Sequence, residues 1–186
     1  MRKAAAVALL WLTLGLACRT APPLPVYGEV PPFRLLAQSG TEFTRGELDG
    51  KVWVADFIFT NCGGPCPMMS SKMRRVQSAV ARYPDVRLVS FTVDPAEDTP
   101  PVLAAYARRY HADPARWFFL TGAAADLNTL GFHAFKLQSV DGGLSHSTRF
   151  VLLDRKSRIR GYYNSSKEGA VENLVADIAR LREEKP

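Results

Sequence analysis

The stretch between Lys51 and Phe59 constrains the fold more than any other part of the sequence, because nearly every position in it is apolar. Only Asp56 interrupts the run. A strand that is apolar on both faces is typical of the middle of a largely parallel sheet, where helices cover each face. The stretch therefore predicts a central strand of an α/β protein, with one carboxyl group inside it.

The rest of the chain alternates strand and helix patterns. Short apolar runs predict further strands at Val86–Val93, Trp117–Leu120, Phe150–Leu153 and Ile159–Tyr163, with a turn at Asp154–Ser157 between the last two. Apolar residues at steps of three and four predict helices from Pro67 to about Val80, from Pro100 to about Tyr110, from Ala123 to about Leu130 and over Val171–Leu181. Gly131 predicts the end of the third helix, and Ser165 with Glu168 has the spacing of a capping box before the fourth. This alternation predicts one α/β sandwich.

Length and composition agree with a single folded domain. The chain has 186 residues, of which 47% are hydrophobic, and this excludes a disordered chain, a coiled coil and a multi-pass membrane protein. The formal net charge is +6, and the basic residues are scattered except at Arg155, Lys156, Arg158 and Arg160. We expect that cluster to be a solvated surface. An acidic partner is the alternative, and nucleic acid is not expected.

The N-terminus has the pattern of an export signal. Arg2 and Lys3 precede an apolar stretch, Ala4–Leu16, that is too short to span the ~30 Å of a bilayer's hydrocarbon core. The stretch ends at Ala17-Cys18, which resembles a bacterial lipobox, although Gly15 stands where a leucine is usual. We expect residues 1–17 to be a lipoprotein-type signal peptide and Cys18 to be lipidated. Ordinary secretion, with Cys18 discarded or free, is the alternative.

The segment after this signal predicts a tether. Residues 18–32 contain five prolines, and proline-rich segments are extended and semi-rigid. We therefore expect residues 18–32 to be a lipid anchor and tether, and residues 33–186 to be the folded domain. This organisation places the protein in a bacterial cell envelope, bound to the membrane through the lipid, with the domain in the periplasm or outside the cytoplasmic membrane.

Two cysteines lie where the central strand is followed by a helix. Cys62 and Cys66 flank Gly63-Gly64-Pro65, directly before Pro67. A helix N-terminus favours thiolate, which is both a nucleophile and a metal ligand. The pair could be a structural disulfide, a redox pair or part of a metal site. Two soft thiolates favour Cu(I) over harder metals, but a third ligand would have to come from elsewhere.

The chain has three histidines that could complete such a site. His111 closes a predicted helix and His133 follows Phe132, so we expect neither to bind metal. His146 follows a glycine-containing loop and precedes a predicted strand. From the residues alone, a ligand role for His146 remains open.

Several aspartates and methionines near the cysteines in the sequence could have either a structural or a functional role. Asp56 either relays protons to the cysteines or, as we expect, accepts a hydrogen bond from a helix or loop N–H. Asp94 and Asp98 precede the Pro100 helix and are expected to cap it. Met69 and Met73 have the spacing of core residues, which leaves Met68 as the only methionine that could assist a copper site.

Several motifs together resemble the Sco/SenC family. They are Ala55-Asp56-Phe57-Ile58-Phe59-Thr60-Asn61-Cys62, Cys66-Pro67 with Met73, Ser90-Phe91-Thr92-Val93-Asp94-Pro95, Asp98-Thr99-Pro100, Leu120-Thr121-Gly122 and His146-Ser147. They occur in the family's order, and the resemblance runs from about Val30 to the C-terminus. It implies a single-domain, thioredoxin-like α/β/α sandwich with a central mixed sheet.

The resemblance also implies a function. Members of the family are membrane-tethered copper chaperones, which assist the assembly of the binuclear copper centre of cytochrome c oxidase. Carried over, the ligands for Cu(I) or Cu(II) are Cys62, Cys66 and His146, and the two cysteines can form a disulfide. The implied partners are the copper-bearing oxidase subunit and other periplasmic copper carriers or thiol reductants. Ser145 replaces the acidic residue that many members have before the histidine, which bears on copper affinity because a carboxylate there would orient the imidazole.

Two enzymatic functions compete with the chaperone. A thiol–disulfide oxidoreductase, acting on the oxidase subunit's cysteines or as a redox sensor, would use Cys62 and Cys66 as its catalytic redox pair. A peroxidase of the peroxiredoxin or glutathione-peroxidase type is the third candidate. Thioredoxin-like reductases carry a cis-proline before the strand that follows their helical middle, yet this chain has no proline between Pro114 and Pro186. His146 lies in that region instead, which favours the chaperone.

Overall fold

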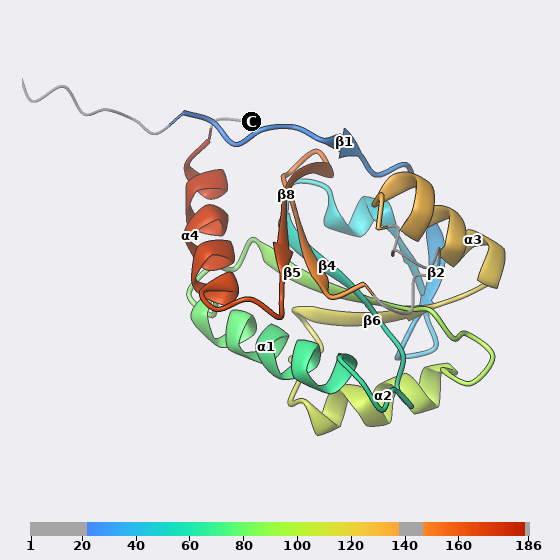
Figure 1. Cartoon of the computed structure of the whole chain (residues 1–186). Coiled ribbons are helices and arrows are strands. Elements are labelled where there is room, and N and C mark those ends of the chain that lie inside the picture. The colour runs from blue at the N-terminus through green and yellow to red at the C-terminus, as the bar shows by residue number, and fades with distance from the viewer. Residues whose placement is uncertain (1–21, 138–146, 185–186) are drawn as a thin grey trace, which may run out of the picture.

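The computed structural model describes residues 22–137 and 147–184 (Figure 1). Eight strands form one sheet in the order β1-β8-β7-β4-β5-β6-β2-β3. The strands are β1 Gly28–Glu29, β2 Arg34–Ala37, β3 Glu42–Thr44, β4 Val52–Ile58, β5 Val86–Thr92, β6 Trp117–Thr121, β7 Arg149–Leu153 and β8 Arg158–Asn164. The helices are α1 Cys66–Ala79, α2 Pro100–Arg109, α3 Ala124–Thr129 and α4 Ala170–Glu183, with a 3₁₀ turn η1 at Arg45–Leu48 and a π-helical turn η2 at Leu130–Ala134.

The predicted central strand is β4, and all seven of its residues are buried. It pairs in parallel with β5 and antiparallel with β7, while β5 pairs in parallel with β6. The sheet is therefore mixed, as expected. β5 pairs with β4 along its whole length to Ile58, whereas the pairing with β7 covers only Trp53 to Ala55. The carboxyl end of β4 is therefore held by β5, and the cysteine-bearing loop leaves from that end.

Two apolar layers cover the sheet. On one face, α1, α2 and α4 bury residues such as Met69, Leu103 and Leu174 against Val54. On the other face, η1, α3 and η2 bury Leu127 and a cluster of aromatic rings that includes Phe135. The result is the expected α/β/α sandwich, with the longer helices on the face that carries the cysteine helix (Figure 1).

Several boundaries differ from the sequence prediction. The strands β1, β2 and β3 were not predicted, because each has only two to four residues and so shows little periodicity. The third helix does not end at Gly131 but continues as the π-helical turn η2. The last helix begins at Ala170 and not near Ser165, because Gly169 adopts φ 72° and turns the chain just before it.

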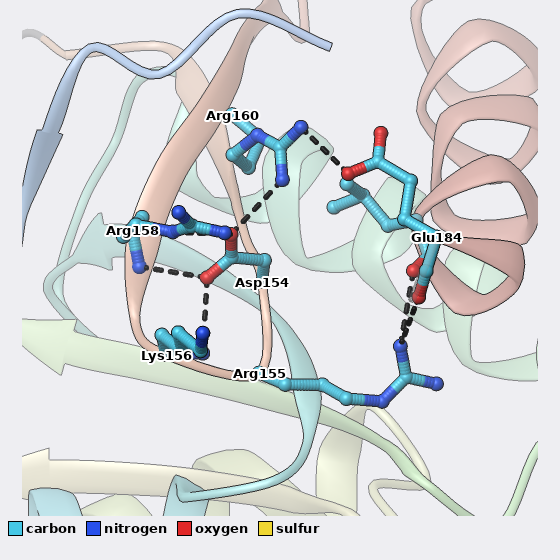
Figure 2. A pocket seen from close by; sticks show the side chains of 7 residues that line it. Asp154, Arg155, Lys156, Arg158, Arg160 and Glu184 are labelled. Atoms are coloured by element: carbon cyan, nitrogen blue, oxygen red, sulfur yellow. Dashed lines mark hydrogen bonds and ion pairs between the residues drawn. The ribbon is translucent and has the colours of Figure 1, made fainter. Parts of the chain in front are cut away.

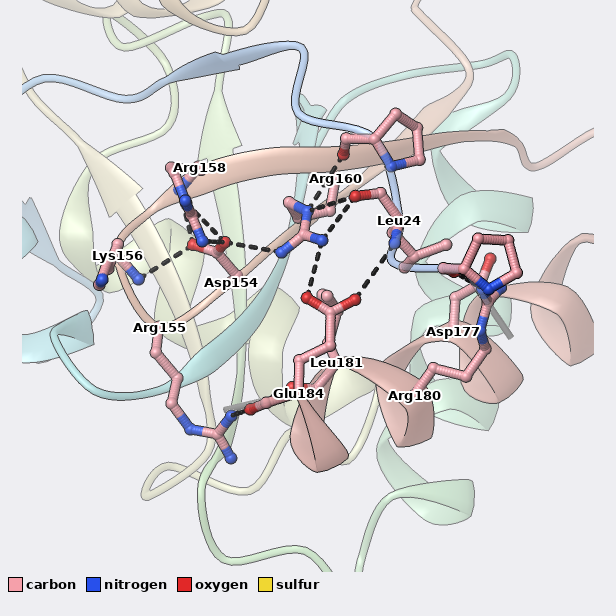
Figure 3. Close-up of polar contacts among 12 residues, drawn as sticks. Leu24, Asp154, Arg155, Lys156, Arg158, Arg160, Asp177, Arg180, Leu181 and Glu184 are labelled. Atoms are coloured by element: carbon pink, nitrogen blue, oxygen red, sulfur yellow. Dashed lines mark hydrogen bonds and ion pairs between the residues drawn. The ribbon is translucent and has the colours of Figure 1, made fainter. Parts of the chain in front are cut away.

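Residues 22–30, which belong to the predicted tether and include β1, lie against the domain, and we call them the N-terminal strap. Gly28 pairs with Ile159 of β8, and the backbone N–H of Val30 donates to the carbonyl of Ser157. Figure 3 shows the Arg160 guanidinium reaching the strap, where it donates to the carbonyl oxygen of Leu24 at 2.6 Å. The strap therefore docks along β8 and the end of α4.

The basic cluster expected to be solvated is an ion-pair network instead, at the turn between β7 and β8 (Figure 2). Arg160 is only 4% exposed and pairs with Asp154 at 2.9 Å and with Glu184 at 2.8 Å. Arg158 pairs with the same Asp154 carboxylate at 2.7 Å. Burial would raise the pKa of Asp154, but hydrogen bonds from Arg158, Lys156 and Arg160 hold that pKa below its ordinary value. The expectation of a solvated surface was therefore wrong for the three arginines, since Arg155 also pairs with Asp85 at 3.2 Å, whereas Lys156 is exposed as expected.

None of the helices within residues 22–137 and 147–184 has the length and apolar character needed to cross a membrane.

Candidate metal and redox site

The cysteine loop connects the carboxyl end of β4 to the start of α1. Cys66 is the first residue of α1, and Pro67 follows it in the first helical turn. Proline is favoured there because its fixed φ suits a helix and its missing N–H would have had no partner in the helix. Cys62 lies in the loop itself, so the two sulfurs meet at the positive end of the helix dipole.

The two thiols differ in environment. Cys66 is 2% exposed, whereas Cys62 is partly exposed. The pKa of the Cys66 thiol is raised to about 12, chiefly by burial and to a smaller extent by the neighbouring Cys62 and Asp56, although a hydrogen bond from the backbone of Phe59 lowers it. Partial burial would also raise the pKa of Cys62, but hydrogen bonds from the backbone and thiol of Cys66 and from Gly64 bring that pKa below its ordinary value.

These differences give the two sulfurs distinct roles. The backbone N–H of Gly64 donates to the Cys62 sulfur at 3.3 Å. A Cβ atom added at Gly64 would come within 3.7 Å of the same sulfur, and one added at Gly63 would meet nothing within 4 Å. Cys62 is therefore the accessible sulfur with thiolate character, and Cys66 is the protected one.

Asp98 fixes the start of the cysteine loop, a role that the sequence analysis missed. Its carboxylate is buried and accepts hydrogen bonds from the Thr60 hydroxyl at 2.5 Å, the Thr60 N–H at 3.1 Å and the Thr92 hydroxyl at 2.5 Å. The expectation that Asp98 caps α2 was wrong, because its carboxylate is turned toward the loop. Asp98 thus ties the residues just before Cys62 to the end of β5.

The sequence did contain a signal for this contact. Thr60 lies two residues before Cys62, and Thr92 ends the neighbouring parallel strand. Carboxyl ends of adjacent parallel strands meet at one edge of the sheet, so a carboxylate that follows Thr92 was within reach of both hydroxyls. Asp94, the other residue expected to cap α2, donates its backbone N–H to the Thr92 hydroxyl at 2.9 Å.

Asp56 is fully buried inside β4. One carboxylate oxygen accepts a hydrogen bond from the Ser90 hydroxyl at 2.6 Å, and Ser90 in turn accepts one from the Trp117 indole at 3.0 Å. The other oxygen has no hydrogen-bond partner among the described residues. The partner is thus a hydroxyl and not the N–H that we expected. Burial raises the pKa of Asp56 from 3.8 to about 7, although the Ser90 hydrogen bond opposes this rise.

The remaining candidates lie as their sequence positions suggested. Met69 and Met73 are fully buried in the core below α1, whereas Met68 is partly buried beside them. His111 and His133 are both exposed. Neither histidine belongs to a group of metal-binding side chains in the described part of the chain.

Three sequence-predicted residues lie outside the described residues: Cys18, Ser145 and His146. Within residues 22–137 and 147–184, no cluster of three or more His, Cys, Asp or Glu side chains is arranged to hold a metal ion. The structure therefore brings together the two cysteines of the predicted site, and the third ligand remains a prediction.

Comparison with known proteins identifies the family. The family model for SCO1/SenC matches residues 25–183. A SCO1/SenC family lipoprotein from Bacillus anthracis has a solved structure with a TM-score of 0.76 and 33% sequence identity, which covers 84% of this chain and 96% of that one.

Two further solved structures are of relatives whose disulfide chemistry or copper binding is described. BsSco, reported with a disulfide switch and described as a member of the Sco family of cytochrome c oxidase assembly proteins, aligns with a TM-score of 0.76 and 28% identity, over 88% of this chain and all of that one. Bradyrhizobium japonicum ScoI, solved with copper bound, aligns with a TM-score of 0.67 and 25% identity, over 83% and 99%. With its thioredoxin-like fold, its cysteine loop and these relatives, the chain belongs to the SCO1/SenC family.

Proposed function

We propose that this chain is a membrane-tethered copper metallochaperone that assists the assembly of the binuclear copper centre of cytochrome c oxidase. The observation that carries the proposal is the pair of free thiols at the start of α1, with Cys62 partly exposed and Cys66 buried. Two soft sulfur donors on one loop suit copper. A copper-bound relative and a relative described as an oxidase assembly protein support the same function.

Copper binding at this site should release protons. Both cysteines must be thiolates to bind the ion, and the pKa of Cys66 is about 12 in the metal-free protein. Copper therefore has to displace the proton from Cys66, which makes apparent affinity fall as the pH falls. The Cys62 sulfur, which already has thiolate character, is the first contact for an arriving ion.

His146 is the proposed third ligand. The strand β7 runs antiparallel to β4, with Ala55 opposite Val151, so the chain enters β7 at the same edge of the sheet from which the cysteine loop leaves. His146 is three residues before Arg149, the first residue of β7, and three residues reach at most about 10 Å. This connectivity supports an imidazole that approaches the two sulfurs.

An anaerobic copper titration of the reduced full-length chain tests the proposal. We expect one copper per chain, with thiolate-to-metal charge-transfer absorption when the ion is Cu(II). His146→Ala should weaken retention, whereas His133→Ala, which removes an exposed imidazole from η2, should not. The proposal fails if replacing both Cys62 and Cys66 with serine leaves the stoichiometry and spectrum unchanged.

A thiol–disulfide oxidoreductase is the second candidate. The pKa values of Cys62 and Cys66 are shifted in opposite directions, and a buried acid, Asp56, contributes to the raised pKa of Cys66. If reduction is the function, Asp56→Asn should slow thiol exchange and impair oxidase assembly, while His146→Ala leaves assembly normal. If copper delivery is the function, His146→Ala impairs assembly and changes the Cys62–Cys66 reduction potential by no more than about 30 mV.

The membrane attachment is proposed to be a lipid on Cys18. The apolar stretch before it and the Ala17-Cys18 junction support this, as does a relative described as a lipoprotein. The domain would then lie in the periplasm or outside the cytoplasmic membrane, where copper carriers and thiol reductants are its proposed partners.

A further inference from the structure

A hollow beside the cysteine pair runs along the outer side of α1. Its lining begins at Pro67, the residue after Cys66, and extends along α1 to Ala79. Arg109 and Tyr110, at the end of α2, line its other wall. The twelve helical steps from Pro67 to Ala79 make the hollow about 18 Å long.

The helices that border this hollow carry basic side chains and no acidic ones. The sequences of α1 and α2 contain no aspartate or glutamate, and their basic residues are Lys72, Arg74, Arg75, Arg108 and Arg109. Among these, Arg75 pairs with the exposed Glu172 at 2.7 Å, and Lys72 donates to the backbone carbonyl of Ser165.

Two of the lining arginines remain without a counter-charge. Arg74 and Arg109 are both exposed, and neither has a carboxylate within 4.0 Å among the residues that the structure describes. Guanidinium groups pair with carboxylates through two parallel hydrogen bonds, so they recognise acidic side chains well. The hollow is therefore complementary in charge to an acidic chain segment.

The position of the hollow favours a protein over a lipid surface. The N-terminal strap docks on β8, which lies toward one edge of the sheet, whereas α2 packs on β6, on the far side of β4 and β5. Figure 1 shows the strap along the top of the molecule and α1 with α2 at the bottom. A membrane attached through the N-terminus thus approaches the opposite side from the hollow.

We propose that the hollow between α1 and the end of α2 binds an acidic segment of the protein that exchanges copper with the cysteine site. This inference rests on the proposed function, because it assumes that the docked protein exchanges copper and therefore has to place its own copper ligands beside Cys62. Docking beside Pro67 would place the partner's neighbouring residues at the cysteine loop. The arginines would act on the association rate and on partner choice more than on the copper site itself.

The test uses the reduced, copper-free full-length chain and two labelled probe peptides. An extended hexapeptide spans about 20 Å, which matches the length of the hollow, so the probes are hexaglutamate and hexaglutamine with a fluorescent label. Fluorescence anisotropy at low salt measures binding. The protein variants are Arg74→Gln with Arg109→Gln and, as a control that also removes two exposed basic side chains, Arg34→Gln with Lys156→Gln.

We expect hexaglutamate to bind the wild type and the control variant, and hexaglutamine to bind neither. The Arg74/Arg109 variant should bind hexaglutamate about fivefold more weakly, because it lacks two exposed ion pairs with the peptide. Added salt should abolish the difference. Equal binding of both peptides, or equal binding by both variants, overturns the proposal. So does a loss of binding to phosphatidylglycerol vesicles in the Arg74/Arg109 variant without a loss of peptide binding. Because no copper is present, these results do not depend on whether the chaperone function holds.

Discussion

Replacing Asp56 with asparagine should make the protein more stable, and the gain should grow with pH. Asparagine keeps the oxygen that accepts the Ser90 hydrogen bond and has nearly the same shape, but it cannot ionise. In the wild type, the pKa of Asp56 is raised from 3.8 to about 7 because the group is fully buried. The substitution therefore isolates the free energy of burying that charge.

The sign and size of the effect follow from the two pKa values. Below pH 3.8 the carboxyl is protonated in both states, and burial of its charge costs nothing. Between pH 3.8 and about 7 the unfolded chain ionises first, so wild-type stability falls by about 1.4 kcal/mol per pH unit. The total loss is about 4 kcal/mol, reached near pH 7 and constant above it.

Urea denaturation, followed by tryptophan fluorescence in the presence of a reductant, can measure this difference from pH 4.5 to 8. The stability gain of Asp56→Asn should rise by about 3 kcal/mol between pH 4.5 and 7 and then level off. Asp126→Asn, which replaces an exposed carboxyl on α3, is the matched control and should change little. A gain that stays constant across the range, or an asparagine variant that is less stable at pH 8, would refute the reasoning.

Three further predictions concern the loop, the strap and the anchor. Asp98→Ala leaves the Thr60 N–H and the hydroxyls of Thr60 and Thr92 without their acceptor, so the free energy of unfolding, measured by urea denaturation, should fall by about 2–4 kcal/mol. The same variant should shift the Cys62–Cys66 disulfide equilibrium with dithiothreitol toward the dithiol. An unchanged equilibrium would show that the loop does not depend on Asp98. Arg160→Ala should destabilise the protein by about 2–4 kcal/mol and make the strap cleavable in limited proteolysis, and full protection would contradict the docking role. Cys18→Ala should release the protein from membranes or stall its processing in cell fractionation, and unchanged retention with normal cleavage would point to peripheral binding.

The sequence predicted the parts of the fold that have strong periodicity. The buried strand β4, the amphipathic helices α1 and α4 and the β7–β8 hairpin were all expected near their observed positions. Each of these elements is specified by a local pattern of apolar residues, and the tertiary contacts agree with that pattern. The short strands β1 to β3 were missed because each has only two to four residues. β1 and β2 are also ordered by pairing with β8 and β6, which lie far along the chain, and not by their own propensity.

The site was only partly predictable for a similar reason. The position of Cys62 and Cys66 at a helix start follows from the local sequence, but the unequal burial of the two sulfurs depends on the core below α1. The role of Asp98 required knowing which strand ends adjoin, and that of Arg160 required the chain's two ends to meet at Glu184. Such contacts between distant segments carry no local pattern.

Docking of the N-terminal strap limits how far the domain can travel from a bilayer. If Cys18 carries the lipid, only the four residues from there to Pro22, whose carbonyl accepts a hydrogen bond from Arg180, are available as a leash, and they extend to about 14 Å. The strap meets β8 near the amino end of β4, and the cysteine loop leaves from the carboxyl end, about 20 Å farther along the strand. Copper exchange would therefore occur within a thin shell above the lipid headgroups, and a partner whose ligands stand much higher could be served only after the strap detaches.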